Sequence, residues 1–379
     1  MHRRHRVWAA IDLEAFRNNL SIAQLTAKSA AVWPVLKANA YGHGALPLAK
    51  VCEEERISCI GIGNSSEALE ILAAGINTPL LVLGTVIDAE LPDLLAYDIQ
   101  VGVHSEGRAK DLGRLAKEAG KTLGVHLKVD TGMGRLGVRP EAAVRAAQAI
   151  AAEPSLKLCG VMTHFSSPKG CLDETTAGQQ ALFQSVLTEL RENNLPIPAW
   201  HCANSAAMFT GLQPLGDAVR PGIGLLGILP PQVEASTHLQ PVLSLHAQIV
   251  FLKDVPAGTA VGYGSRWTSH RATRLATLPI GYADGLPYRL GAQGRGAVLV
   301  GGHRCPIVGA VSMDYCVVDV GHVPGVELGD TATFIGRQGT EVLSVIELAE
   351  AAGTIPYEIT CSIGGRVERL YQKSPAMIS

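Results

Sequence analysis

Lys37 stands where an amine is least expected, directly after the apolar stretch "AVWPVL" of residues 31–36. The next six residues, "ANAYGH", add an amide, a phenol and an imidazole. Lysine is among the residues least often buried. In a partly desolvated site it loses its proton readily and forms a Schiff base with an aldehyde. Lys37 is therefore a candidate nucleophile, and a lysine that extends to solvent from a strand end is the alternative.

Polar side chains also end or follow the later apolar runs of the chain. They are Lys128 and Asp130, His164, Asn204 and Ser205, and Arg220, with Asn64, Thr85 and His104 after the runs between. Each has a structural alternative, such as a turn for "DTGMGRLG" (130–137) or a packed histidine for His164. If the runs are strands of one barrel, these groups meet on one rim, where barrel enzymes carry their chemistry.

Two short segments have the composition of a phosphate cradle. They are "ANSA" (203–206) and "RPGIG" (220–224), after the seventh and eighth runs. Barrel phosphate sites commonly use backbone N–H groups of these two loops. A tight loop without a ligand is the alternative for "RPGIG". A nucleophilic lysine beside a phosphate cradle suggests pyridoxal phosphate as the cofactor.

The elements that must position these groups alternate regularly over the first two thirds of the chain. The apolar runs cover residues 31–36, 57–62, 79–83, 99–103, 123–129, 156–163, 199–202 and 218–225. Stretches of helical period between them include residues 67–74, 106–119, 141–152 and 175–193, and a helix over 13–27 precedes the first run. Eight such units predict an α/β fold, a (β/α)8 TIM-type barrel.

The pattern of apolar runs and helical stretches changes near residue 239. Strand-like runs closed by Gly and Pro turns follow, and one helix is expected, over residues 342–352. We therefore predict a barrel over residues 11–239 and a mostly β domain over residues 240–379.

The composition excludes several classes of protein. Of the 379 residues 47% are hydrophobic, and the formal net charge of -2 gives no basic stripe for nucleic acid. No stretch has the roughly 18 apolar residues of a membrane span, and Asp12 and Glu14 interrupt any signal sequence. The eight cysteines form no CxxC pair and no zinc spacing. We expect a soluble cytoplasmic enzyme without a metal, a membrane partner or a nucleic-acid partner.

Nine motifs between residues 35 and 367 resemble, in order, those of the alanine racemase family, pyridoxal-phosphate enzymes on a fold-type III barrel. They are "VLKANAYGHG", "HLKVDTGMGRLGVRP", "THF", "HCANSA", "RPGIGLLG", "VGYGSRW", "PIGYADG", "VSMDY" and "PYEITCSIGGRV". The resemblance implies an isomerase that interconverts L-alanine and D-alanine and supplies D-alanine for peptidoglycan, the cell-wall polymer. It also implies a homodimer with shared active sites, and a β domain that includes an N-terminal strand over residues 1–10.

The resemblance also implies roles for individual residues. Lys37 and Tyr263 are the two catalytic bases, and Tyr263 and Met313 reach the site from the partner subunit. The cofactor is held by Lys37, Tyr41, His164, Asn204, Ser205, Arg220, Gly222, Ile223 and Tyr357. Arg220 faces the pyridine nitrogen, with His164 bonded behind it. Arg135 and Met313 lie near the substrate, and Lys128 is a candidate carbamate that pairs with Arg135.

Chemistry makes these roles coherent. Racemisation removes the α-proton on one face of a planar carbanion and returns one on the other, so two bases on opposite faces are needed. Tyrosine has an ordinary pKa of about 10, which nearby cations must lower. Arginine cannot accept a hydrogen bond, so Arg220 leaves the ring nitrogen unprotonated. The ring is then a weaker electron sink, which favours clean racemisation.

Three positions depart from the family pattern, and two other functions are compatible with the motifs. Tyr288 stands where arginine is usual, Tyr315 follows "SMD", and Leu226 replaces a frequent tyrosine. Tyr288 and Tyr315 are expected near the substrate entrance, so a racemase of serine or another amino acid is the alternative enzyme. A non-catalytic pyridoxal-phosphate carrier is the alternative of a different class. A decarboxylase on the related barrel is disfavoured, because that group pairs the pyridine nitrogen with a carboxylate.

Overall fold

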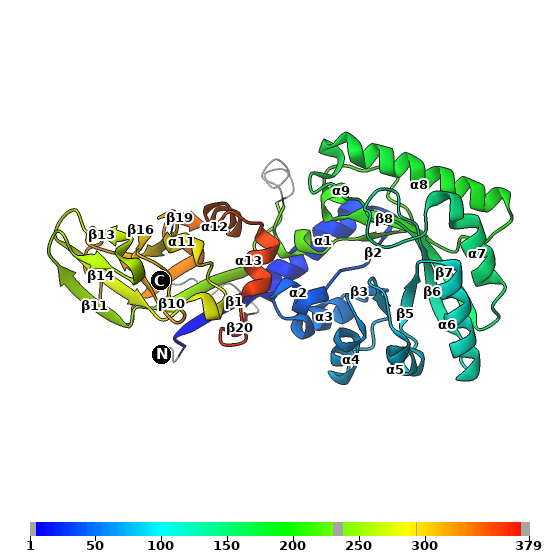
Figure 1. The fold of residues 1–379 in the computed structure, drawn as a ribbon, viewed down its shortest axis with the longest axis horizontal. Coiled ribbons are helices and arrows are strands. Elements are labelled where there is room, and N and C mark those ends of the chain that lie inside the picture. Colours follow the sequence, from blue (N-terminus) through cyan, green and yellow to red (C-terminus); the bar gives the residue numbers. More distant parts are fainter. Residues whose placement is uncertain (1–4, 230–237, 293, 373–379) are drawn as a thin grey trace. The chain divides into compact units, whose positions relative to one another are not determined.

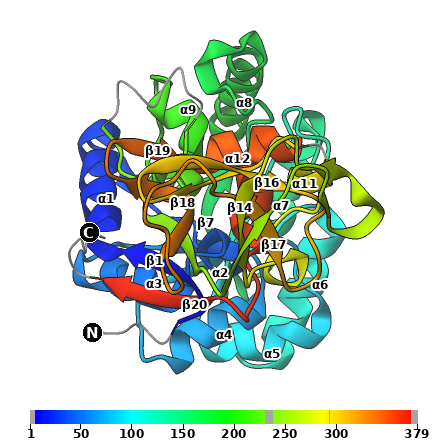
Figure 2. The same cartoon turned by 90° about the vertical axis from the view of Figure 1, so that its left-hand side faces the viewer.

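The computed structural model describes residues 5–229, 238–292 and 294–372. The chain forms two compact units. The barrel unit comprises Phe16–Ala40 and Ala45–Gln240. The β unit comprises Met1–Ala15, Tyr41–Gly44 and Pro241–Ser379. Figure 1 labels the helices and strands of both units, and Figure 2 gives a second view of them.

The barrel unit contains one sheet of eight parallel strands, in the order β2-β9-β8-β7-β6-β5-β4-β3. A bridge between Val35 and Gly61 joins the two ends, with Leu36 N donating to Gly61 O at 2.9 Å. The sheet therefore closes, and the predicted (β/α)8 barrel is confirmed. Its strands are β2 Ala31–Val32, β3 Ile60–Ile62, β4 Leu80–Val82, β5 Gln100–Val103, β6 Leu123–Lys128, β7 Leu156–Met162, β8 Trp200–Asn204 and β9 Ala218–Arg220.

Helices cover the outside of these strands, as Figure 1 shows for α4 to α8. Side chains of Asn64, Ser105 and Asp173 cap α4, α6 and α8 by accepting backbone N–H groups of the first turn. The helices are α1 Leu13–Ala27, α3 Ala45–Glu54, α4 Ser65–Ala73, α5 Leu91–Ala96, α6 Glu106–Glu118, α7 Ala143–Ala151, α8 Glu174–Glu192 and α9 Ser205–Phe209. Short 3-10 turns are η1 Asp88–Glu90, η2 Pro140–Ala142, η3 Gly170–Leu172 and η4 Ile223–Leu226.

The β unit is built on a ten-stranded sheet in which β1 Val7–Asp12 pairs antiparallel with β10 and parallel with β20. The other strands are β10 Leu243–Gln248, β11 Phe251–Val255, β14 Thr273–Leu278, β15 Ala297–Val300, β16 His303–Val308, β17 Cys316–Asp319, β18 Thr331–Gln338, β19 Glu341–Leu343 and β20 Glu368–Gln372. A separate hairpin joins β12 Ala260–Val261 and β13 Trp267–Thr268. The 3-10 turns of this unit are η5 Tyr263–Ser265 and η6 Tyr282–Asp284.

The expectation of a single helix over residues 342–352 was wrong. The helix α12 is Val345–Ala352, because Ser344 caps it and Glu341–Leu343 form β19. Two further helices are α11 Arg289–Ala292 and α13 Pro356–Ser362. Pro356 sits in the first turn of α13, where its missing N–H costs nothing. Both helices are too short to give a readable 3.6-residue period. Among the described residues, no helix is long and apolar enough to cross a membrane.

Candidate active site

A cavity of about 270 Å³ opens in the barrel unit where the strands reach their carboxyl ends. It gathers four basic side chains, and none of the described residues that line it carries a carboxylate. Its lining residues are Lys37, Gly63, Leu83, Gly84, Lys128, Arg135, Leu136, Met162, Thr163, His164 and Arg220. Five predicted site residues therefore surround one cavity, although they are spread over more than 180 positions of the sequence.

Arg220 is the last residue of β9 and only 5% of its surface is exposed. Its Nη2 donates to Thr163 O at 2.6 Å and to Cys202 O at 3.3 Å, and Nη1 donates to Nδ1 of His201. Burial lowers the pKa of Arg220 to about 10, so the guanidinium stays charged at neutral pH. The expectation that His164 bonds behind Arg220 is corrected, since His201 makes that bond in the described structure.

The cluster of cations disfavours further positive charge in the cavity. Burial, followed by the charges of Arg220 and Lys37, lowers the pKa of His164 to about 3. Burial, followed by Arg220 and Arg135, lowers the pKa of Lys128 to about 8. His164 is therefore neutral at pH 7, and Lys128 has an appreciable neutral fraction. The cavity is suited to an anionic ligand.

Two of the four cationic side chains of the cavity are Lys128 and Arg135, which lies in the loop after Lys128. Lys128 is 7% exposed, and its Nζ donates to Leu83 O at 3.1 Å. Asp130 accepts the backbone N–H groups of residues 132, 133 and 134 at 3.0, 2.8 and 3.1 Å. One carboxylate oxygen thus shapes the turn that leads to Arg135. The carboxylate of "DTGMGR" is a structural group, in agreement with the turn considered for that motif.

Lys37 is followed by an unusual backbone turn, labelled α2 (Lys37–Tyr41) in Figure 1. Its last four residues, Ala38 to Tyr41, have φ angles of 53, 52, 51 and 52°, in the left-handed region. Each such residue costs about 1–2 kcal/mol when it is not glycine. Nothing in the residue types "ANAY" requires this conformation, so the surroundings must impose it.

Two side chains of the barrel unit hold this turn. Glu67 on α4 accepts Ala38 N–H through Oε1 at 2.7 Å and Gly63 N–H through Oε2 at 2.8 Å. Asn39 accepts Ala45 N–H at 2.7 Å through its own side chain. Glu67 therefore connects the backbone beside Lys37 to the end of β3, another wall of the cavity. Strained backbone of this kind concentrates at functional sites.

The two segments predicted as a phosphate cradle lie against each other. Ser205 Oγ accepts the N–H groups of Gly222 and Gly224 at 2.9 and 3.1 Å. Asn204 caps α9, with its Oδ1 accepting Ala207 N–H at 2.9 Å. Ile223 begins η4 and is buried. The loop therefore brings one hydroxyl and two backbone N–H groups together at one point, and Asn204 fixes the start of α9.

The remaining predicted residues belong to the β unit. The rings of Tyr41 and Tyr357 are in contact, with centroids 5.9 Å apart. Tyr263 lies in η5 and is 78% exposed, and Met313 is 53% exposed. The three departures from the family pattern also have clear positions. Tyr288 and Tyr315 are exposed on the β unit, whereas Leu226 is buried in the barrel unit.

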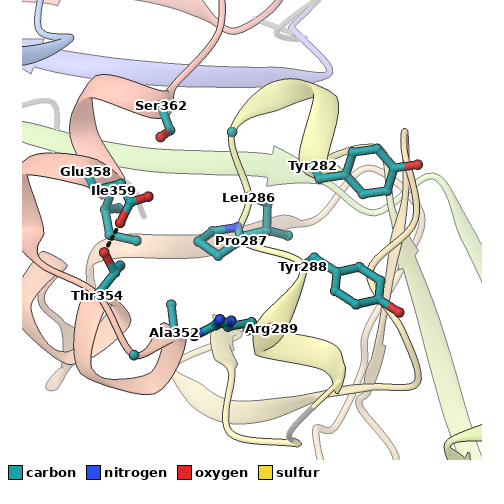
Figure 3. A pocket seen from close by; sticks show the side chains of 12 residues that line it. Tyr282, Leu286, Pro287, Tyr288, Arg289, Ala352, Thr354, Glu358, Ile359 and Ser362 are labelled. Atoms are coloured by element: carbon teal, nitrogen blue, oxygen red, sulfur yellow. Dashed lines mark hydrogen bonds between the residues drawn. The ribbon is translucent and has the colours of Figure 1, made fainter.

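A second pocket, of about 590 Å³, lies within the β unit between η6–α11 and α12–α13 (Figure 3). Tyr282, Tyr288 and Arg289 line one side, and Glu358 lies opposite, hydrogen bonded to Thr354. The pocket therefore contains Tyr288, one of the three departures from the family pattern. It contains none of the predicted catalytic residues.

Sequence reasoning missed three residues of the site. His201 stands inside the motif "HCANSA", and its place one residue into β8 was the available signal. Gly224 lies in the quoted "RPGIG". Glu67 gave no signal, because its role depends on a turn whose conformation the residue types do not reveal. In the described part of the chain, no group of three or more His, Cys, Asp or Glu could hold a metal ion.

Comparison with known proteins connects this geometry to one family. The family described as "Alanine racemase, N-terminal domain" matches residues 11–230, and "Alanine racemase, C-terminal domain" matches residues 242–371. The chain is 38% identical to an alanine racemase of Methanococcus maripaludis, over 97% of this chain and 99% of that protein.

Solved structures agree with this. The alanine racemase of a D-cycloserine-producing Streptomyces lavendulae is 35% identical, with a TM-score of 0.93 over 98% of both chains. That of Bartonella henselae, solved with covalently bound pyridoxal phosphate, is 29% identical, with a TM-score of 0.87 over 97% of this chain and 99% of that one. The chain therefore belongs to the alanine racemase family, a family of isomerases.

Proposed function

We propose that this chain is a pyridoxal-phosphate-dependent racemase that interconverts L-alanine and D-alanine. The observation that carries the proposal is the cavity itself, in which Lys37 shares one space with Arg220 and no described lining residue is acidic. Such a site provides an amine for an aldehyde and a donor for a ring nitrogen. It does not provide the carboxylate that would protonate that nitrogen.

The described residues fit pyridoxal phosphate part by part. Within the barrel unit, Ser205 and the backbone N–H groups of Gly222 and Gly224 converge and would hold the phosphate, together with Ile223. The family resemblance assigns Tyr41 and Tyr357, whose rings are in contact within the β unit, to the same phosphate. Lys37 would hold the aldehyde carbon, and Arg220 the ring nitrogen. Asn204 would keep the phosphate loop in place, and His164 would line the ring. When bound, the cofactor supplies a conjugated system that stabilises negative charge at the substrate α-carbon.

Arg220 determines how much of that charge enters the ring. A guanidinium has five N–H donors and no acceptor, so it can only donate to a pyridine nitrogen. Arg220 is 5% exposed and has no acidic partner among the described residues. Its guanidinium would therefore keep a positive charge beside the nitrogen. That charge disfavours protonation of the nitrogen. Less charge stored in the ring means less protonation at the wrong carbon.

The α-proton is exchanged by two bases in this proposal, Lys37 and Tyr263 of the partner subunit. Bases on opposite faces of the α-carbon are required, because the proton leaves one face and returns on the other. Tyr263 is 78% exposed within its own chain, which supports a role completed by a second copy. Met313 of the partner subunit would approach the substrate in the same homodimer.

Arg135 and Lys128 would bind the substrate side of the site. Unmodified Lys128 and Arg135 both have cationic side chains, and Arg135 lies close enough to lower the pKa of Lys128. Carbon dioxide adds to a neutral amine and releases one proton, giving a carbamate that would pair with Arg135. The lowered pKa of Lys128, about 8, supplies the neutral amine. The resemblance alone supports the wider role, which is to provide D-alanine for peptidoglycan in the cytoplasm.

The test is racemase activity of the purified protein with added pyridoxal phosphate. Each L-amino acid of a panel is incubated, and chiral chromatography measures the D-enantiomer formed. We expect alanine to be the best substrate, with no conversion by Lys37→Ala and normal conversion by Lys50→Ala, a control lysine paired to Glu53 on α3. Faster conversion of serine or a larger amino acid would favour the other racemase. Cofactor binding without any conversion would favour the carrier.

A further inference from the structure

A line of hydrogen-bonded side chains leads away from Arg220 through the interior of the barrel. Arg220 on β9 bonds to Nδ1 of His201 on β8. Nε2 of His201 lies 2.9 Å from Nδ1 of His126 on β6. Nε2 of His126 lies 2.7 Å from Oε1 of Gln100, the first residue of β5. The two histidines are 0% and 1% exposed, so the line is sealed from water along its middle.

Elementary donor and acceptor rules fix every proton in this line. Arginine only donates, so Nδ1 of His201 must be an acceptor and carries no proton. The proton of a neutral His201 is then on Nε2, which donates to Nδ1 of His126. His126 must in turn carry its proton on Nε2, which donates to Gln100. The amide of Gln100 therefore presents its oxygen to His126, and all three bonds point the same way.

The packing around the two rings is shaped for this contact. Gly160 on β7 is paired with His126, and a Cβ there would lie 2.7 Å from Nδ1 of His126. Any other residue at that position would strike the atom that accepts the bond from His201. Trp33 packs across both rings, with centroids 4.8 Å from His201 and 6.0 Å from His126. The rings can therefore neither rotate freely nor admit water between them.

We infer that His201, His126 and Gln100 form a one-directional relay that positions Arg220, and that Gln100 is the terminal positioning residue of the site. Gln100 begins its strand, whereas Arg220 ends its own, so the relay joins opposite ends of the barrel strands. The consequence for catalysis rests on the proposed role of Arg220 toward a ring nitrogen. The arrangement of protons in the relay does not depend on that proposed role, because it follows from the hydrogen bonds alone.

The neutral amide at position 100 is the feature that preserves the direction. A carboxylate there would stabilise a doubly protonated His126, whose Nδ1–H would then point at Nε2 of His201. His201 would have to move its own proton to Nδ1, against an N–H of Arg220. Glutamate at position 100 should therefore weaken the bond between Arg220 and His201, although it lies two residues further along the relay.

Neutron diffraction of the wild-type holoenzyme, exchanged into heavy water, tests the relay directly. We expect deuterium on Nε2 of both His201 and His126 and none on either Nδ1. Deuterium on Nδ1 of either ring would overturn the inference. This experiment does not depend on any activity, so it stands even if the proposed function fails.

The second experiment tests whether the relay positions Arg220. Gln100→Leu and Gln100→Glu are compared with Gln184→Leu, a partly exposed glutamine on α8. Gln100→Leu leaves the buried Nε2–H of His126 without an acceptor, and Gln100→Glu reverses the protons of the relay. Both variants should therefore lower kcat for alanine about five- to tenfold, with KM little changed. Both should also form more pyruvate per racemisation event, a readout that general loss of stability would not move. Folded, cofactor-loaded variants at position 100 that behave like Gln184→Leu would overturn the positioning role.

Discussion

Replacing Glu67 with glutamine should weaken cofactor binding while leaving the barrel unit nearly as stable as before. Glu67 does not line the cavity and has no predicted chemical role. It accepts two backbone N–H groups, from Ala38, which follows Lys37 in the chain, and from Gly63, which lines the cavity. Glutamine has the same shape but can accept only through one oxygen, so its NH2 group would face the second N–H.

The magnitude follows from the two bonds and from the strain they hold. A hydrogen bond to a charged group contributes about 1.5–3 kcal/mol, and the lower end applies here because Ala38 is exposed. Glutamine retains one neutral bond of about 1 kcal/mol, so the net loss is about 2 kcal/mol, or roughly thirtyfold in an equilibrium constant. The left-handed turn of four non-glycine residues stores about 4–8 kcal/mol.

Relaxation of that turn compensates for the lost bond. The folded protein gives up one bond but releases part of the strain, so its free energy of unfolding should change by less than about 1 kcal/mol. The Tm should then fall by less than about 4 °C in a unit of this size. Cofactor binding must restore the strained turn without its partner, so binding loses the remaining ~1–2 kcal/mol and the Kd should rise about five- to thirtyfold.

The assay compares cofactor-stripped wild type, Glu67→Gln and Glu70→Gln, a control in which an exposed residue of the same helix is changed. Titration with pyridoxal phosphate gives each Kd, calorimetry gives each Tm, and hydrogen exchange reports the amides of Ala38 and Gly63. Those two amides should exchange faster only in Glu67→Gln. Equal cofactor affinity in the two variants would refute the reasoning, as would a fall in Tm of 10 °C or more with unchanged affinity.

Three further predictions concern Lys128, the dimer and the buried histidines. Removing dissolved carbon dioxide should lower activity, bicarbonate should restore it, and acetate should partly rescue Lys128→Ala; an active, bicarbonate-insensitive Lys128→Ala would exclude the carbamate. Mixing inactive Lys37→Ala and Tyr263→Ala subunits should restore about a quarter of wild-type activity, since half of the dimers regain one site; a mixture that exchanges subunits yet stays inactive would refute shared sites. Burial lowers the pKa of His126 to about 3 and that of His104 to about 4, below the ordinary 6.5. Below about pH 6.5 the unfolded chain then binds protons that the folded chain does not, so the free energy of unfolding, measured with urea, should fall between pH 6.5 and 4. His126→Asn should flatten that slope and His322→Asn, at an exposed position, should not; equal slopes would contradict the assignment.

The barrel could be predicted because its signals are local and repeated. Each of the eight apolar runs overlaps a strand, and the helix expected over residues 13–27 has those bounds in the structure. The last run ends at Arg220 rather than at residue 225, because Pro221 cannot donate to the sheet and the chain turns into η4. Strand ends then indicated which polar residues surround the cavity.

The rest depended on geometry that residue types do not carry. The motif "KANAYGHG" indicated a reactive lysine but not a left-handed turn, since alanine, asparagine and tyrosine normally avoid that region. His201 and His164 both belong to motifs, and only the register of β8 decides which of them bonds to Arg220. Gly160 lies in no quoted motif, and only the structure shows that a side chain there would collide with His126.

Exchange of the α-hydrogen in heavy water tests the central claim most directly, that Lys37 and Tyr263 of the partner subunit act as separate bases. L-alanine and D-alanine are incubated separately with wild type, Lys37→Ala and Tyr263→Phe, each loaded with cofactor, and deuterium at the α-carbon is measured by mass spectrometry. Wild type should exchange both enantiomers, and each variant should retain exchange with one enantiomer only, a different one in each case. Loss of exchange with the same enantiomer in both variants, or racemisation near the wild-type rate in either, would contradict the two-base account.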